Sequence, residues 1–239
     1  MDLFSDSLSA ALRLLGEGNR AVLEIVLLSL RVSGVALLVG SLLGLPVGIA
    51  LGITRFPGRR LLVALVYTGF ALPPVVVGLF VYMLLSRAGP LGELRLLFTP
   101  TAMVLAQAVL AAPYVAGITL AAVQSVPAEV RLQARALGAS AARALWMHVR
   151  EARLGIGAAI IAGFGAVISE VGAVMLVGGN IAGETRVMTS AIVLETRRGD
   201  FATALALGLI LLLVAFAVNL ALTAGQQRGA VLADVRRTW

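Results

Sequence analysis

The chain contains no cysteine and no lysine, and charged residues make up only 13% of its 239 residues. Without cysteine, neither disulfide bonds nor thiolate-bound metals can hold the fold together. Without lysine, the chain has no GxxxxGK[ST] phosphate loop, so any ATP chemistry must come from a partner chain. The scarcity of charge excludes an ordinary soluble globular domain.

What the chain does have is long apolar sequence. Hydrophobic residues make up 60% of it, and its mean hydropathy is +1.01. A helix of about 20 apolar residues crosses about 30 Å of hydrocarbon, whereas the strands of a barrel would show alternating segments of about 10 residues. The sequence therefore predicts an all-α membrane protein with about five transmembrane helices. The expected spans are Val32–Ile53, Leu61–Leu85, Thr101–Val123, Ile156–Val177 and Phe201–Thr223.

The two ends of the chain are expected on opposite sides of the membrane. Segment 1–20 lacks the basic start and apolar core of a cleavable signal, and its apolar residues recur at helical spacing. It is therefore expected to be an external amphipathic segment at the membrane interface. Arginine is more frequent on the side that holds residues 54–60, the insert 125–153 and the C-terminal tail. This bias predicts a multi-pass protein of the inner membrane, with an external N-terminus and a cytoplasmic C-terminus.

The insert 125–153 is polar, carries five arginines and separates the third expected span from the fourth. Its sequence predicts two short helices, with Gly138 closing the first in a left-handed conformation and Ser140 capping the second. A solvated connector would need neither strong helix formers nor exposed apolar residues such as Leu137 and Trp146. We therefore expect another protein to bind this insert on the cytoplasmic side.

Part of the insert resembles a known family. The stretch QARALGAS from Gln133 to Ser140, followed by ARLGI from Ala152, resembles the EAA loop of permease subunits in binding-protein-dependent ABC importers. In that family the loop forms the coupling helix, which docks on the ATP-binding subunit. The glycine of the motif matches Gly138, whereas its glutamate falls on Leu132 and its later proline on Arg150. The resemblance implies a coupling surface made of Leu132, Gln133, Ala134, Arg135, Leu137, Gly138, Ala139, Ser140 and Arg143.

A second stretch is similar to a subgroup of that family. Residues 163–180, GFGAVISEVGAVMLVGGN, and residues 185–208 resemble the tungstate-type permeases, which are related to molybdate permeases. The general resemblance covers nearly the whole chain. It implies a single transmembrane domain, 1–239, with the type I ABC importer permease fold.

The resemblance also implies partners and a substrate. A second copy of the chain, two ATP-binding subunits and an external oxyanion-binding protein would complete the importer, and ATP and Mg²⁺ would be bound by the ATP-binding subunits. Tungstate is the expected anion, with molybdate, sulfate and phosphate as alternatives, since the binding protein selects the anion. From another class, an ATP-independent ion-coupled carrier or channel is the alternative, although carriers usually show paired repeats.

No residue pattern predicts catalysis, metal binding, cofactor binding or nucleic-acid binding within this chain. His148 is the single histidine. Without a second histidine it is expected to be a solvated side chain of the insert rather than a metal ligand.

The fourth expected span contains a carboxylate, Glu170, next to Ser169. A charge inside the hydrocarbon costs about 2.5 to 3.5 kcal/mol, so Glu170 should face protein and be paired or protonated, with Arg31 as a candidate partner. A gate residue and a structural hydrogen bond are equally open interpretations. Beyond this span, Gly178, Gly179 and Asn180 are expected to form a turn. The family resemblance implies that the external segment 178–200 meets the substrate-binding protein and helps to close the outward gate, and this segment is expected to contain a short helix. The expected path or gate residues are Ser169, Glu170, Gly172, Gly178, Gly179, Asn180, Thr185 and Arg186.

Glycine and proline predict how the spans pack and bend. The first span has a glycine at every fourth position, namely Gly40, Gly44, Gly48 and Gly52. This spacing permits close contact with a neighbouring helix. Pro73 and Pro74 should break the second span and Pro113 the third, because each proline frees a backbone carbonyl.

Overall fold

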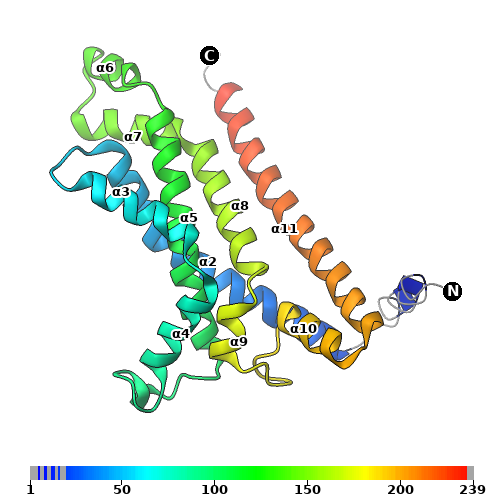
Figure 1. Cartoon of the computed structure of the whole chain (residues 1–239). Coiled ribbons are helices and arrows are strands. Elements are labelled where there is room, and N and C mark those ends of the chain that lie inside the picture. Colours follow the sequence, from blue (N-terminus) through cyan, green and yellow to red (C-terminus); the bar gives the residue numbers. More distant parts are fainter. Residues whose placement is uncertain (1–4, 6–7, 10–11, 14–15, 17–19, 236–239) are drawn as a thin grey trace. The chain divides into compact units, whose positions relative to one another are not determined.

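The computed structural model describes residues 5, 8, 9, 12, 13, 16 and 20–235, so the predicted amphipathic segment lies largely outside the described residues. The described chain is helical, and no β-strand occurs in it (Figure 1). Two short 3₁₀ segments, η1 (Gly69–Ala71) and η2 (Gly92–Leu94), accompany the α-helices. The helices are α2 (Arg20–Ile53), α3 (Arg59–Thr68), α4 (Pro74–Leu85), α5 (Pro100–Ser125), α6 (Glu129–Ala136), α7 (Ala141–Glu151), α8 (Arg153–Ile168), α9 (Gly172–Gly178), α10 (Met188–Arg198) and α11 (Phe201–Val235).

Three helices, α2, α5 and α11 as far as Gln226, are each long and apolar enough to cross a membrane. Two bent pairs bring the count to five if each pair is one span: α3 and η1 with α4, bent by 100°, and α7 with α8, bent by 55°. The prediction of about five spans therefore agrees with the described helices. The fourth expected span, 156–177, differs, because α8 ends at Ile168 and α9 begins only at Gly172.

The chain folds into two compact units. Unit 1 comprises residues 1–36, 72–109 and 167–218, and unit 2 comprises residues 37–71, 110–166 and 219–239. Helices α2, α5, α8 and α11 contribute residues to both units.

In unit 1, the short helix α9 packs along α4 (Figure 1). A Cβ atom added at Gly78 of α4 would lie 2.6 Å from the Cα atom of Ala173. That distance is too short for any larger residue, so Gly78 allows the two backbones to approach. Both helices also supply buried apolar side chains, namely Val77, Val81, Val174 and Val177.

In unit 2, the glycines of α2 face α5. Added Cβ atoms at Gly44 and Gly48 would lie 2.6 and 2.4 Å from the carbonyl oxygens of Ala112 and Ala116. An added Cβ atom at Gly52 would lie 2.7 Å from a methyl carbon of Val123. The glycine pattern therefore serves close helix packing within the chain, which confirms the prediction made from its spacing.

The prolines act differently from one another. Pro73 and Pro74 interrupt the chain between η1 and α4, as predicted. Pro113 does not break α5, which continues through it from Pro100 to Ser125. The Pro113 ring instead packs against Gly69, where an added Cβ atom would lie 2.3 Å from the Cβ atom of Pro113. The prediction of a break in the third span is therefore wrong, because packing of the proline ring against η1 is compatible with a continuous helix.

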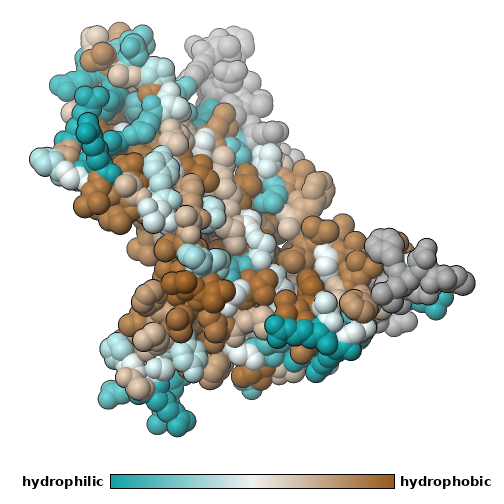
Figure 2. Space-filling view, in the orientation of Figure 1, coloured by the Kyte–Doolittle hydropathy of each residue, from teal (hydrophilic) through white to brown (hydrophobic). Residues whose placement is uncertain are grey.

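The surface divides by polarity. Figure 2 shows hydrophilic side chains gathered over α6 and α7 in unit 2. Helix α11, in contrast, exposes large apolar side chains, namely Leu212, Leu213, Phe216 and Leu220. Such a face is suited to contact with lipid or with another apolar helix.

Candidate functional site

The predicted gate residue Glu170 lies in the break between α8 and α9. Its side chain is buried, and its two carboxylate oxygens accept hydrogen bonds from the backbone N–H groups of Ala173, at 2.9 Å, and Val174, at 3.0 Å. These two N–H groups belong to the first turn of α9, where a helix has no internal partners for them and where its dipole is positive. Glu170 therefore caps α9 from inside the protein.

Glu170 does not pair with Arg31. Arg31 is exposed on α2, whereas both oxygens of Glu170 are used by the backbone of α9. The predicted ion pair is therefore wrong, and so is the placement of Glu170 within a continuous span. The pair was expected because Arg31 and Glu170 lie at a similar depth along their predicted spans. The carboxylate of Glu170 has nearer partners, because the helix break leaves the first N–H groups of α9 free.

The backbone on either side of Glu170 is also held by buried polar side chains. The Thr189 hydroxyl donates to the carbonyl oxygen of Glu170 at 2.8 Å. The Gln107 amide donates to the carbonyl oxygen of Val167 at 2.8 Å. The end of α8 and the start of α9 are therefore tied to α10 and α5 within unit 1.

The start of α10 has a further attachment. The backbone N–H of Met188 donates to the hydroxyl of Ser29 at 2.8 Å, and that hydroxyl donates to the carbonyl of Ile25 on α2 at 2.7 Å. Neither Ser29 nor Thr189 is among the site residues predicted from the sequence. A serine or threonine inside an apolar stretch is a weak signal that many packed helices share.

The turn after α9 gathers four of the predicted gate residues. Gly179 ends α9 with a φ of 71°, and Asn180 follows with a φ of 52°. The Thr185 hydroxyl donates to the carbonyl of Gly178 and accepts from the N–H of Ile181 at 2.9 Å. The predicted turn at residues 178–180 is therefore confirmed, and a buried threonine closes it.

Charged and amide groups complete this turn. Arg186 donates through its Nε to the Asn180 side-chain oxygen at 3.3 Å and through a terminal nitrogen to the Asn180 carbonyl at 3.4 Å. The Ser190 hydroxyl donates to the same side-chain oxygen at 2.9 Å. Asn180, Arg186 and Ser190 thus form one network at the start of α10, and the predicted short helix in this segment is confirmed as α10.

The remaining two gate residues lie apart from that network. Ser169 is exposed in the break before Glu170. Gly172, the first residue of α9, lies against α4, since an added Cβ atom there would be 2.6 Å from a methyl carbon of Val75. The structure therefore places Gly172 in helix packing.

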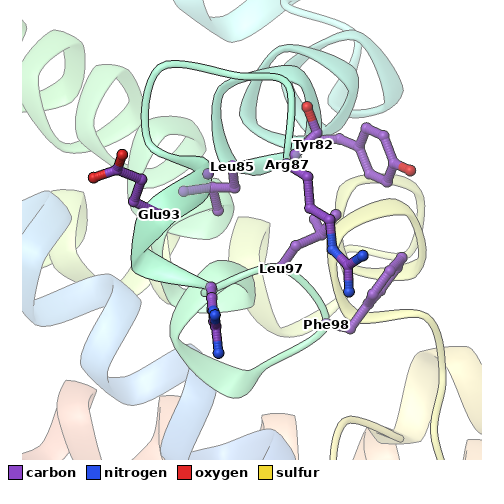
Figure 3. Close-up of a pocket in the computed structure, with 9 residues that line it drawn as sticks. Tyr82, Leu85, Arg87, Glu93, Leu97 and Phe98 are labelled. Carbon is purple, nitrogen blue, oxygen red and sulfur yellow. The ribbon is translucent and has the colours of Figure 1, made fainter.

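The connection between α4 and α5 forms a cavity of about 980 Å³ that sequence reasoning missed. Arg87, Glu93 and Arg95 line it. Figure 3 shows the Arg87 side chain extending toward the ring of Phe98, whereas Glu93 points away. The N–H of Phe98 donates to the carbonyl of Val177 at 2.9 Å, so this connection is fixed to the end of α9. The sequence signal that could have indicated this cavity is the pair Arg87 and Arg95 in a connection that also contains glycine and proline.

The predicted coupling surface is formed by α6 and α7 in unit 2. Gly138 joins them with a φ of 87°, and the Ser140 hydroxyl accepts from the N–H of Arg143 at 3.3 Å, which caps α7. Both local predictions are confirmed. Ala134 on α6 and Ala144 on α7 are buried, so small side chains occupy positions where these helices pack.

The corner itself exposes apolar side chains. Leu137 is 89% exposed, Leu132 65% and Trp146 58%. Among the other predicted coupling residues, Gln133, Arg135 and Arg143 are exposed and Ala139 is half-buried. Exposed apolar side chains on the same two helices as exposed arginines are typical of a protein-binding surface.

His148 is buried rather than solvated. Its Nε2 donates to the carbonyl oxygen of Val123, near the end of α5, at 3.1 Å, and only 3% of the residue is exposed. Burial lowers the pKa of His148, the hydrogen bond to Val123 raises it, and the nearby positive charge of Arg131 lowers it. The expectation of a solvated side chain is therefore wrong, because α7 packs back against the end of α5.

Comparison with known proteins adds an independent result. Residues 44–228 match the family described as "Binding-protein-dependent transport system inner membrane component". A "Probable anion ABC transporter permease protein" of Haloferax volcanii is 45% identical over 86% of this chain and 91% of its own length. A "Tungstate uptake system permease protein TupB" of Peptoclostridium acidaminophilum is 39% identical over 92% of this chain and 96% of its own length.

A solved structure shows the same fold. The crystal structure of a bacterial ABC transporter involved in the import of the acidic polysaccharide alginate aligns with a TM-score of 0.72. The alignment covers 95% of this chain and 90% of that one, at 18% identity. The all-α importer permease fold expected from the sequence is thereby confirmed.

Proposed function

The chain belongs to the family of inner membrane components of binding-protein-dependent transport systems. We propose that it carries a tetrahedral oxyanion, tungstate, into the cell. The observation that carries the choice of anion is its similarity, along almost its whole length, to a tungstate uptake permease. The similarity to an anion permease of a second organism supports the same substrate class.

The proposed complex contains two copies of this chain, two ATP-binding subunits and an external binding protein that delivers the anion. ATP and Mg²⁺ are bound by the ATP-binding subunits, since this chain has no lysine with which to build a phosphate loop. The exposed corner of α6 and α7 is the proposed docking surface for the ATP-binding subunit, with Leu132, Leu137 and Trp146 as its apolar contacts.

The orientation follows from this assignment. The α6–α7 insert and the C-terminus face the cytoplasm, and the N-terminus and segment 178–200 are external, in keeping with the arginine bias. The external segment is the proposed contact for the binding protein and part of the outward gate. Arg186 and Ser190 both donate hydrogen bonds to the side chain of Asn180. Thr185 donates to Gly178 and accepts from Ile181, and together these bonds support a segment that moves as one body.

Transport would proceed by rigid-body movement. Closure of the ATP-binding subunits displaces the docked α6–α7 corner, and the membrane helices tilt from an inward-open to an outward-open arrangement. Glu170 would serve in this movement as a cap that keeps α9 and the break before it intact. Its carboxylate is used by backbone N–H groups, so it would not repel the passing anion as a free charge in the path would.

Reconstitution tests the proposal. The chain, its ATP-binding subunit and its binding protein are placed in proteoliposomes, and uptake of tungstate is measured with and without ATP. ATP-dependent tungstate uptake that excess sulfate does not suppress is the expected result. ATP-dependent uptake that prefers molybdate, sulfate or phosphate would change the proposed substrate but support the proposed importer. Uptake without ATP would overturn the proposal in favour of an ion-coupled carrier or channel.

A further inference from the structure

Unit 2 contains a second cavity, of about 350 Å³, which belongs to neither the predicted gate nor the predicted coupling surface. It lies where α2 and α5 end and α6 begins. Its lining residues are Gly52, Ile53, Thr54, Arg55, Arg59, Val123, Gln124, Ser125, Val126, Pro127, Ala128, Arg131 and His148. The volume equals about twelve water molecules at roughly 30 Å³ each, so a small ion with part of its hydration shell fits.

The charges in this cavity are all positive. Arg55, Arg59 and Arg131 line it, and no aspartate or glutamate does. Glu129, adjacent in sequence, is exposed and is not part of the lining. Within the described part of the chain, Arg55 and Arg131 have no hydrogen bond or ion pair, whereas Arg59 donates through Nε to the carbonyl of Leu51 at 2.8 Å.

Helix ends account for only part of this charge. The C-terminal ends of α2 and α5 each carry about half a negative charge, and the N-terminal end of α6 carries about half a positive one. Set against three arginines, these leave about two and a half unbalanced positive charges, more than enough to neutralise a tetrahedral dianion. Arg59 and His148 cap the carbonyl ends of α2 and α5, but this capping does not account for the two further positive charges of Arg55 and Arg131 at the cavity.

His148 supplies the second observation. The residue is only 3% exposed, and its Nε2 donates to the carbonyl of Val123. Its other ring nitrogen, Nδ1, is buried and has no partner among the described residues. Because Nε2 carries the proton of the neutral ring, Nδ1 is an acceptor and the partner it needs is a donor. The hydroxyl of a monoprotonated phosphate, or a water molecule, in the cavity that His148 lines would supply one.

We propose that this cavity binds a tetrahedral oxyanion, held by Arg55, Arg59 and Arg131. The ligand is either the free ion or the phosphate of an anionic lipid, since both present the same oxygens to guanidinium groups. The site is separate from the predicted gate residues, all of which belong to unit 1. The proposal does not depend on which anion the importer carries.

The test uses the purified complex of this chain with its ATP-binding subunit, without nucleotide, in nanodiscs of phosphatidylcholine. Calorimetric titration measures the binding of inorganic phosphate and, separately, of tungstate. The variant Arg55→Gln with Arg131→Gln is compared with Arg60→Gln, which removes a neighbouring exposed arginine that does not line the cavity. Neither Arg55 nor Arg131 holds the fold through a hydrogen bond, so the double variant should keep the melting temperature of the parent.

Binding of one ion per chain, weakened at least about tenfold in the double variant and unchanged in Arg60→Gln, supports the site. Repetition in phosphatidylglycerol nanodiscs identifies the source, because a lipid phosphate in the cavity would abolish binding of the free ion there. Absence of binding in both lipids, or equal weakening in both variants, overturns the proposal. Uptake measured in parallel separates this outcome from failure of the proposed function, since phosphate binding here does not require tungstate transport.

Discussion

The corner between α6 and α7 and the break between α8 and α9 are both interruptions of helix, but they are built in opposite ways. At the corner, a glycine with a φ of 87° and a serine cap satisfy the backbone locally, and apolar side chains are left exposed. At the break, a buried carboxylate and side chains from other helices satisfy the backbone. The corner is therefore suited to binding a partner, whereas the break depends on the rest of unit 1.

This difference sets where substitutions should act. A change at the corner should alter the partner surface and leave the fold intact. A change at the break should lower the stability of the fold, because its buried hydrogen bonds connect the break to α5, α9 and α10. Measuring stability and partner binding together separates the two regions.

The largest loss of stability is expected from Glu170→Ala. The substitution leaves the buried N–H groups of Ala173 and Val174 without acceptors, at a cost of about 2 to 3 kcal/mol. Denaturation of the purified protein in detergent measures this cost. Arg31→Gln is the control and should be silent, since Arg31 is exposed and does not pair with Glu170. Equal losses in the two variants would contradict the capping role.

A smaller loss of stability, with a large loss of transport, is expected from Gly138→Val. A β-branched residue with positive φ is strained by about 1 to 3 kcal/mol, and the corner relieves the strain by redirecting α7. ATP-driven uptake should fall while membrane insertion stays normal. Gly34→Ala is the control, because an added Cβ atom there meets nothing within 4 Å. Normal uptake by Gly138→Val would exclude the docking geometry proposed for the corner.

Leu137→Glu should leave the stability of the chain unchanged and weaken its association with the ATP-binding subunit. The side chain is 89% exposed, so its loss removes no internal packing. Loss of an apolar contact and addition of a negative charge should weaken association with the ATP-binding subunit about tenfold, or about 1.4 kcal/mol. A pull-down in detergent measures this, and the pair Arg135→Glu and Arg143→Glu should behave alike. A drop in melting temperature without weaker association would mean that the corner is part of the core.

The same comparison explains what the sequence can predict. The corner is predictable from neighbouring residues, because Gly138 allows a positive φ and Ser140, two residues later, caps the next helix. The turn at Gly178–Asn180 and the close packing at Gly48 were predictable for the same reason. The importer family and its fold were predictable from motifs that are continuous along the chain.

The break could not be predicted in this way. The carboxylate of Glu170 was visible, but its partners are backbone N–H groups that become available only because α8 stops at Ile168. Thr189 and Ser29 come from distant parts of the chain, and their contacts depend on how α10 packs. Pro113 and His148 were misjudged for one reason, namely that packing against another helix overrode the local expectation.

The smallest expected effect is a dependence of stability on pH at His148, which lies on α7 and packs against the end of α5. Burial lowers the pKa of this histidine, so the unfolded chain takes up a proton at a higher pH than the folded chain does. The stabilisation is therefore complete above about pH 6.5, the usual pKa of histidine, and is lost as the pH falls below it. The slope cannot exceed about 1.4 kcal/mol per pH unit, the limit for one proton.

Thermal denaturation between pH 5 and 8 in a buffer free of phosphate and sulfate measures this slope, and His148→Gln should remove it while keeping an amide donor for the carbonyl of Val123. Asp200 provides the contrast. Its pKa is also lowered, by hydrogen bonds from the backbone and side chain of Thr203, but a carboxylate releases its proton far below this range. A slope that persists in His148→Gln would assign the titration to another group and remove the reason for treating His148 as neutral beside the arginines.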